Sequence, residues 1–141
     1  MVLASTPFHH IEYYAVHNVI VSQWYGACTS QEYRDTLLHF LHLMEEMKVP
    51  YAIADRRLLP PISLEDSRWT LQEFLKGFRK LPLKRFAFIN SFDPAAEKQL
   101  QYFMNTSKVK PFPFEVAVFE DLTSAYEWLI KASEDNHFPA A

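Results

Sequence analysis

Glycine and cysteine are both scarce in this chain of 141 residues. Glycine occurs only twice, as Gly26 and Gly77. Glycine-rich phosphate loops, collagen repeats and flexible linkers all need more glycine than this, so the sequence excludes these classes. The single cysteine, Cys28, excludes an internal disulfide and fits a reducing compartment, for which we predict the cytoplasm.

Long apolar runs and blocks of basic residues are absent as well. No stretch approaches the roughly 18 apolar residues that a membrane-spanning helix needs. Residues 1–10 lack the basic and apolar regions of a signal peptide. The formal net charge is −3 with both signs interspersed, so no basic surface for a nucleic acid is indicated. We therefore expect neither a membrane span nor a nucleic-acid partner.

Aromatic residues, in contrast, are abundant. They make up 16% of the chain, within a hydrophobic content of 49%. Either some of these rings line a pocket or a shared surface, or all of them fill the core. The length predicts a single domain over residues 1–141, large enough to bury a core without disulfides or metals. We expect residues 1–9 and 133–141 to be flexible.

One stretch, residues 50–69, has the pattern of a ligand-binding junction. It begins with the apolar residues 51–54, continues with the charged residues 55–57, turns at two prolines and restarts at Ser63, a helix N-cap residue. This pattern predicts a buried strand, a loop and a helix start. In open α/β sheets, ligands and partners usually bind outside the carboxyl ends of such strands.

The chain before this junction predicts a hairpin and a helix. Residues 11–16 and 19–25 are rich in β-branched and aromatic residues, and Asn18 between them suits a tight turn. A capping box and apolar residues at three-and-four spacing then predict an amphipathic helix over residues 30–48.

The chain after the junction alternates between helix and strand. Residues 85–91 and 114–120 are the predicted strands, and capped helices are expected to follow each of them. Trp69 falls outside the apolar stripe of the helix that begins at Ser63. We expect that stripe to be buried; it consists of Leu64, Leu71, Phe74, Leu75 and Phe78.

The resulting order of elements is β-β-α-β-α-β-α-β-α. A hairpin followed by βα alternation predicts an α/β fold. Its sheet would be a single mixed layer of about five strands, with the N-terminal hairpin at one side and a parallel centre, accompanied by four helices.

Several segments between residues 9 and 131 carry a resemblance. A strand ends in Trp24-Tyr25-Gly26 before a capped helix, and another strand ends at Asp55. With the segments 63–69, 84–89 and 118–129, these features resemble the small bacterial STAS-like proteins. Their parent fold is that of the anti-sigma-factor antagonists, and lipid-binding domains of the CRAL-TRIO type share a related sheet.

This resemblance implies a non-enzymatic regulatory or ligand-binding domain. In the sigma-regulating members, a serine at the start of the helix after the third strand accepts phosphate from a partner kinase. The nearest position here is Ser63, with Ser67 one turn further on. The other interpretation of Ser63 is a plain N-cap of its helix.

The charged group after the central strand has two interpretations. Asp55, Arg56 and Arg57 lie beside a helix start, where two guanidinium groups suit an anion or a carboxylate of a partner. Alternatively, Asp55 forms a structural ion pair with an arginine or accepts hydrogen bonds from loop amides.

Three aromatic residues stand near the predicted junctions. Trp24, Tyr25 and Trp69 lie away from the clear core stripes, so they either line a pocket or an interface, or pack loops over the core. All three are candidate residues for binding a ligand or a partner.

We predict no metal, no cofactor and no catalytic group. His39 and His42 have a spacing that suits a metal, but they fall on the polar side of a helix, where they form ordinary pairs with acidic residues. Cofactor motifs are also lacking.

Three functions remain open. The first is a non-catalytic regulatory domain that binds a protein partner or a second copy of itself. The second is a carrier of a small apolar ligand, acyl or lipid-like, whose acidic head would contact Arg56 and Arg57. The third is an enzyme that uses Asp55, which requires that Asp55 face an open cleft.

Overall fold

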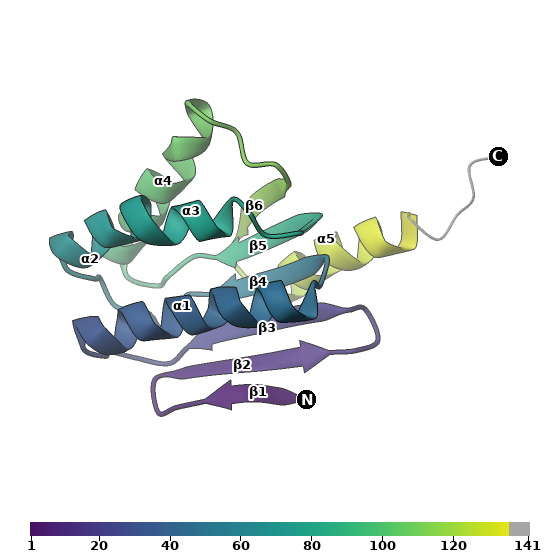
Figure 1. The fold of residues 1–141 in the computed structure, drawn as a ribbon, viewed down its shortest axis with the longest axis horizontal. Coiled ribbons are helices and arrows are strands. Elements are labelled where there is room, and N and C mark those ends of the chain that lie inside the picture. The colour runs from purple at the N-terminus through teal and green to yellow at the C-terminus, as the bar shows by residue number, and fades with distance from the viewer. Residues whose placement is uncertain (136–141) are drawn as a thin grey trace.

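The computed structural model describes residues 1–135 of the chain, which form one six-stranded sheet with helices on both faces (Figure 1). The strands follow one another in the sheet in chain order. They are β1 (Val2–Ser5), β2 (His9–Tyr14), β3 (Val19–Trp24), β4 (Tyr51–Asp55), β5 (Arg85–Ile89) and β6 (Glu115–Phe119). The helices are α1 (Ser30–Met47), α2 (Leu64–Trp69), α3 (Leu75–Phe78), α4 (Pro94–Asn105) and α5 (Leu122–Asp135), with a π-helical turn (Thr70–Phe74) and a 3-10 turn (Thr106–Lys108).

The N-terminal segment is a strand, so the prediction of a flexible lead over residues 1–9 is wrong. β1 pairs antiparallel with β2, and the Met1 ammonium group donates a hydrogen bond of 2.8 Å to the Tyr13 carbonyl. β1 is short and has few residues that favour strands, so its order comes from pairing with β2. The sheet within residues 1–135 therefore has six strands, one more than predicted.

The predicted hairpin and parallel centre are confirmed. β2 and β3 are antiparallel, and β3, β4, β5 and β6 are parallel to one another. The hairpin turns over residues 15–18, and Asn18 has a φ of 59°, a left-handed conformation that asparagine tolerates. The fold class predicted from the sequence, a mixed α/β sheet with four helices, is correct when α2, the π-helical turn and α3 are counted as one continuous helix.

Helix starts follow the capping residues. Thr29 and Glu32 form the reciprocal capping box of α1. Asp93, which precedes Pro94 at the first position of α4, accepts a hydrogen bond from the Ala95 amide. The Asp121 carboxylate accepts a hydrogen bond of 2.7 Å from the Ser124 amide at the start of α5. These contacts place each helix immediately after the strand that precedes it.

The helices divide unequally between the two faces of the sheet. Because the parallel strands follow in chain order, each crossover advances in the same direction, and right-handed crossovers then place their helices on one face. Accordingly, α1, the α2–α3 helix and α4 cover one face, which we call the helical-layer face, while α5 covers the other, which we call the α5 face (Figure 1).

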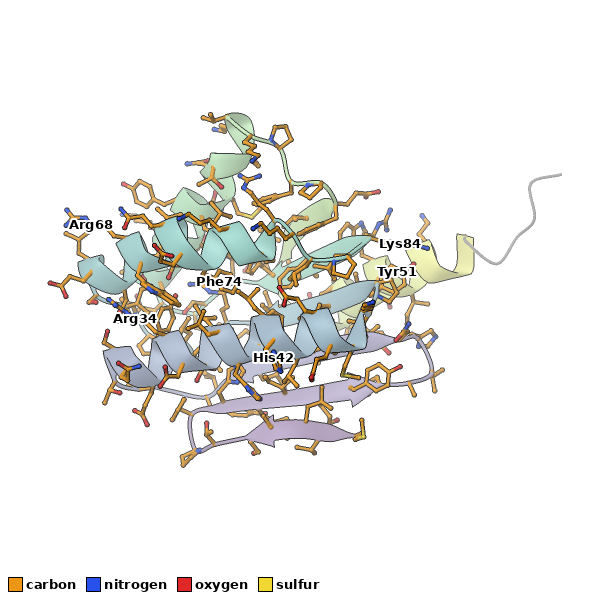
Figure 2. The ribbon with its side chains drawn as sticks, viewed as in Figure 1. Arg34, His42, Tyr51, Arg68, Phe74 and Lys84 are labelled. Atoms are coloured by element: carbon orange, nitrogen blue, oxygen red, sulfur yellow. The ribbon has the colours of Figure 1, made fainter. Side chains whose placement is uncertain are left out.

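The two faces have different cores. Phe78, which is fully buried, contacts the rings of six other phenylalanines on the helical-layer face, and Phe74 turns toward the sheet there (Figure 2). The α5 face is packed by mostly aliphatic side chains from the sheet together with Ala125 and Leu129, both 0% exposed. The core on the helical-layer face is therefore much richer in phenylalanine rings than the core on the α5 face, which contains smaller side chains.

The helix after Ser63 differs from its predicted stripe. Phe74, Leu75 and Phe78 are buried as expected, but Leu64 is 67% exposed because α2 begins beyond the edge of the core. The Leu75 amide donates to the Thr70 carbonyl five residues earlier, which is the π-helical hydrogen bond. Such a turn shifts the helix face relative to a regular spacing and is frequent at functional sites.

The prediction of a flexible tail over residues 133–141 falls only partly on the described residues. α5 continues to Asp135, two residues beyond the predicted start of the flexible tail at residue 133. Residues 136–141 lie outside the described part of the chain. Within residues 1–135, no helix is both long and apolar enough to cross a membrane.

Candidate functional site

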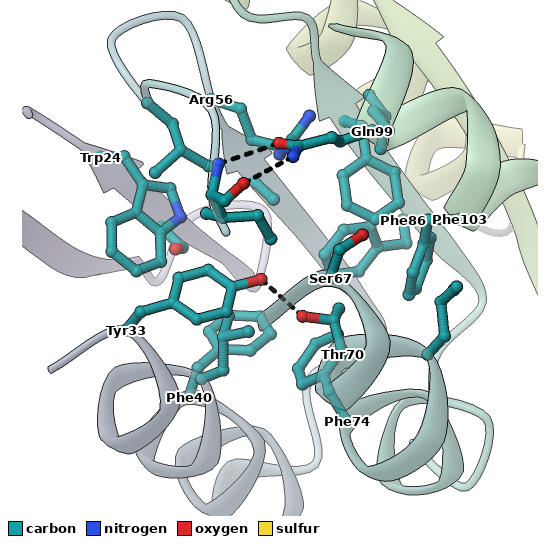
Figure 3. Close-up of a pocket in the computed structure, with 18 residues that line it drawn as sticks. Trp24, Tyr33, Phe40, Arg56, Ser67, Thr70, Phe74, Phe86, Gln99 and Phe103 are labelled. Atoms are coloured by element: carbon teal, nitrogen blue, oxygen red, sulfur yellow. Dashed lines mark hydrogen bonds between the residues drawn. The ribbon is translucent and has the colours of Figure 1, made fainter. Parts of the chain in front are cut away.

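A pocket lies between the sheet and the helical layer, at the carboxyl ends of β3 and β4. Its cavity volume is about 70 Å³, which accommodates several water molecules or a compact ligand. Figure 3 shows side chains from the sheet, α1, the α2–α3 helix and α4 around it. Since the strand order has no reversal, this is not the switch-point crevice of doubly wound folds.

The walls of the pocket are mainly aromatic. Phe86 and Phe88 point to the same face of β5 because they are two residues apart, and their ring centroids are 4.8 Å apart. Trp24 closes the pocket from β3 and stacks on Tyr33 of α1, with ring centroids 5.7 Å apart. Further rings come from the helical layer: Phe40, Phe74 and Phe103.

Arg56 is the charged residue of this pocket. It follows β4, whose side chains alternate between the faces, so that Ala54 and Arg56 both line the pocket. Its guanidinium group has no hydrogen bond or ion pair within residues 1–135, and Nη1 is buried without a partner. Burial lowers the pKa of Arg56 to about 10, with an opposing effect from Tyr33, so the group is still a cation at neutral pH.

Asp55 and Arg57 lie on the other face of the sheet. Arg57 donates to Asp55 from Nε at 3.0 Å and from Nη2 at 2.7 Å, and its backbone amide donates at 3.1 Å. Burial by itself raises the pKa of Asp55, but the hydrogen bonds from Arg57 and Gln23 outweigh it and lower the pKa. The structural ion pair considered for Asp55 is thus present.

The hypothesis that Arg56 and Arg57 hold one anion together does not fit this geometry. Alternation along the extended chain sends them to opposite faces, and Arg57 is already paired. The enzyme hypothesis requires that Asp55 face an open cleft, whereas its side chain is only 6% exposed and accepts hydrogen bonds from Arg57 and Gln23.

Three polar contacts surround Arg56 in the pocket. The Tyr33 hydroxyl and the Thr70 hydroxyl share a hydrogen bond of 2.7 Å, and burial raises the pKa of Tyr33 to about 12. The Gln99 side chain donates to the Ile62 carbonyl at 2.8 Å and accepts from the Ile62 amide at 3.0 Å (Figure 3). Gln99 thereby ties the loop after β4 to α4 and closes one side of the pocket.

Ser67 also lines the pocket, and Figure 3 shows its side chain among the pocket residues. Its backbone amide continues the helix by donating to the Ser63 carbonyl at 2.9 Å, while its hydroxyl takes part in no hydrogen bond within residues 1–135. Ser67 is therefore available to a ligand without the loss of a contact.

Ser63 caps α2, as the plainer of its two interpretations predicts. Its hydroxyl accepts a hydrogen bond of 3.1 Å from the Asp66 amide. The Asp66 side chain is 6% exposed; burial raises the pKa of this carboxyl, but hydrogen bonds from Ser30, Arg34 and Ser63 together lower it. Phosphate on Ser63 would lie near this carboxylate and displace the cap. The phosphoacceptor role stays a prediction.

The three candidate aromatic residues have different surroundings. Trp24 is 4% exposed and lines the pocket. Trp69 packs outside it, against Tyr33 and under the Arg34 guanidinium, 5.5 Å from the ring centroid. Tyr25 is 47% exposed, and its hydroxyl donates to Gln23. Only Trp24 is brought together with Arg56.

The histidines of α1 face outward (His42 in Figure 2). His42 lies 3.4 Å from Glu46, the ordinary pair of a helix surface. Among residues 1–135, His9 is the buried histidine: it is 3% exposed, and its Nε2 lies 2.7 Å from the hydroxyl of Ser22, which lines the pocket. Burial, with smaller effects of His10 and His39, lowers the pKa of His9 to about 4, so it is neutral at pH 7.

Several pocket residues were not singled out from the sequence as binding candidates. Tyr33, Ser67, Thr70 and Gln99 come from three different helices, and only the folded chain brings them together. The sequence offered one signal for the pocket: side chains of a strand alternate between its two faces, which places Arg56 on the face opposite to Asp55 and Arg57.

No family model and no curated protein matches this sequence significantly. Among solved structures, the fold matches an uncharacterized protein of the DUF3478 family from Shewanella loihica PV-4, whose structure has a SpoIIAA-like fold. The TM-score is 0.57 at 23% identity, over 89% of this chain and 98% of that chain. This chain has a SpoIIAA-like fold. The STAS-like architecture predicted from the sequence is thereby confirmed, while the likeness at this identity concerns the fold alone.

Proposed function

We propose that this STAS-like protein is a non-catalytic binding domain that takes a small molecule between its sheet and its helical layer. The observation that supports this most is the pocket itself: an aromatic-lined cavity on which polar groups from the loop after β4, from α1 and from the α2–α3 helix converge. The π-helical turn adds to the support, because Thr70 and Phe74 belong to it and line the cavity.

The ligand is compact. A cavity of about 70 Å³ suits a body of a few non-hydrogen atoms better than the acyl chain considered from the sequence. A chain of that kind would have to displace buried rings such as Phe74 and Phe103, which pack against each other with centroids 6.2 Å apart. We therefore propose binding or sensing of a small metabolite in place of lipid transport.

A library of small molecules screened by thermal shift, with native mass spectrometry of freshly purified protein, tests this function. Ser67→Leu places a larger side chain into the cavity, and Gln72→Leu places the same side chain on the exposed side of the same helix. We expect ligands that stabilise the unmodified protein and Gln72→Leu but not Ser67→Leu. Ligands that bind all three proteins equally, or the lack of any ligand, would contradict the proposal.

Protein recognition is a second candidate, and one surface feature favours it. Exposed apolar side chains follow three neighbouring strands: Tyr25 after β3, Leu58 after β4 and Phe92 after β5, the last being 71% exposed. The Phe92 amide donates to the Arg57 carbonyl, which holds two of these loops together. We propose a protein partner or a second copy of this chain here, in a regulatory role and in the cytoplasm. Light scattering after size exclusion tests self-association; a strict monomer at high concentration counts against it.

A further inference from the structure

Within residues 1–135, Arg56 differs from every other arginine that is at least partly buried. Arg34 is paired with Asp66, Arg57 with Asp55 and Arg85 with Glu115. Arg79 donates to the Pro111 carbonyl at 3.1 Å. The guanidinium of Arg56 has neither an acidic partner nor a carbonyl, although its Nη1 is buried.

A buried cation without a partner is unfavourable, because it has lost the solvation that water provides. The drop of the Arg56 pKa to about 10 reflects this loss. Sequence neighbours do not relieve it, since Asp55 lies on the other face of the sheet, bonded to Arg57. An anion bound in the pocket would restore the missing interaction, and a planar guanidinium suits a carboxylate through two parallel hydrogen bonds.

The rest of the pocket selects among anions. Arg56 is its single cation, and the adjoining walls are the rings of Phe86, Phe88 and Phe103. A phosphate group carries more charge and more acceptor oxygens than one guanidinium satisfies. A monocarboxylate brings one negative charge and an apolar body for the rings, and the unused Ser67 hydroxyl lies in the same cavity.

We infer that the pocket binds a small organic monocarboxylate, with Arg56 as its counter-ion and an apolar body of a few atoms against the phenylalanine rings. This inference rests on the proposed function and specifies the ligand class for that site. The buried aromatic environment strengthens the ion pair, because little water competes for either group.

Isothermal titration with chosen probes tests the ligand class. The probes are isobutyrate and benzoate, the neutral isobutyramide and benzamide, and inorganic phosphate, each at millimolar concentration. We expect at least one carboxylate to bind, and its amide and phosphate to bind about thirtyfold more weakly or not at all, the range for loss of one partner of a buried charge pair. Amides that bind as well as the acids, phosphate that binds more tightly than both, or no binding by either acid would overturn the inference.

Variants of Arg56 test whether the carboxylate binds at this residue in the pocket. Arg56→Met keeps the length of the side chain and removes the charge, so carboxylate binding is expected to be lost, while Arg56→Lys retains part of it. Arg68→Gln is the matched control, because it removes the same charge from an exposed position of α2 (Figure 2) and is expected to bind as the unmodified protein does. Unchanged binding by Arg56→Met, with circular dichroism confirming its fold, would overturn the inference.

The two proposals fail in different ways. If the library yields neutral ligands that Ser67→Leu excludes, while isobutyrate and benzoate do not bind, the pocket is a binding site but the anion inference is wrong. If no small molecule depends on Ser67, the proposed function itself is wrong.

Discussion

Two neighbouring arginines, Arg56 and Arg57, lie on opposite faces of the sheet, and only Arg57 has an acidic partner within residues 1–135. On the α5 face, Arg57 pairs with Asp55, and the core of that face consists of mostly aliphatic side chains. On the helical-layer face, Arg56 is left without a partner beside a cavity. Asp55 and Arg57 therefore satisfy each other on the α5 face, whereas on the helical-layer face the buried Nη1 of Arg56 has no partner within residues 1–135. Imperfect local satisfaction in an otherwise consistent fold is typical of functional sites.

The largest effects on stability are expected when a buried core side chain is removed from either face. Phe78→Ala should lower the free energy of unfolding by about 4 kcal/mol, because Phe78 is fully buried among phenylalanines and its loss enlarges the empty space there. Leu129→Ala, the matched change on the α5 face, should cost about 3 kcal/mol. Urea denaturation measures both, and a larger cost for Leu129→Ala would reverse the comparison of the two cores.

Acid should weaken the helical-layer face first. His9 is neutral when folded, with a pKa of about 4 compared with an ordinary value of 6.5, so the unfolded chain binds more protons between these values. Stability therefore falls as the pH drops from 6.5 to 4, by on the order of 3 kcal/mol. The pKa of Asp55 is lowered, so the stability that its ion pair with Arg57 gives the α5 face is lost only when the pH falls below the ordinary value of 3.8.

Unfolding of the His9→Gln variant at several pH values checks this assignment. The variant is expected to be less stable at pH 7, because the buried contact with Ser22 is altered, but to lose less stability between pH 6.5 and 4. A pH dependence as steep as that of the unmodified protein would show that other groups control acid unfolding.

Replacing each of the two neighbouring arginines is expected to affect stability differently. Arg57→Met should destabilise the protein by about 1–2 kcal/mol, because it leaves the buried Asp55 carboxylate without its partner; solvent at the partly exposed Arg57 reduces the effect below that of a fully buried pair. Arg56→Met should leave stability unchanged or raise it, since it removes an unpaired buried cation. Thermal or urea denaturation of the two variants measures these changes. A loss of stability in both variants would mean that Arg56 has a structural role.

The smallest effect is expected at Gln23, which adds one bond to the ion pair on the α5 face. Its amide donates to Asp55 at 3.3 Å, near the upper limit for a hydrogen bond. Gln23→Leu should therefore cost less than about 1 kcal/mol of unfolding free energy. A cost as large as that of Arg57→Met would indicate that the ion pair depends on Gln23 for its geometry.

Much of the fold was predictable because its signals are local. The capping residues Thr29 and Asp93 place helix starts, and the apolar strand Tyr51–Asp55 indicates a buried position in a parallel sheet. β1 was missed because its order depends on pairing with β2, a partner that is separate in sequence. Leu64 was misplaced because helical periodicity does not show where a helix leaves the core.

The candidate site was predictable only in part. The stretch containing Arg56 was correctly placed at the carboxyl end of a central strand, and Trp24 does line the pocket. Tyr25, Arg57 and Trp69 do not line it, and Gln99 joins it from a helix more than forty residues along the chain from Arg56. Residue type marks a candidate, but its direction depends on backbone alternation and on what packs opposite.

The sequence by itself determined the order of strands and helices, the caps that begin the helices and the apolar character of both faces, since each depends on residues close together in the chain. Strand alternation separates Arg56 from Asp55, but the tertiary structure decided that Asp55 pairs with Arg57. Asp55 has two arginines within two positions of it, and the face to which each side chain points selects Arg57. It also decided that three helices enclose a cavity beside Arg56, because the aromatic rings that line it come from distant parts of the chain and meet only when the chain is folded.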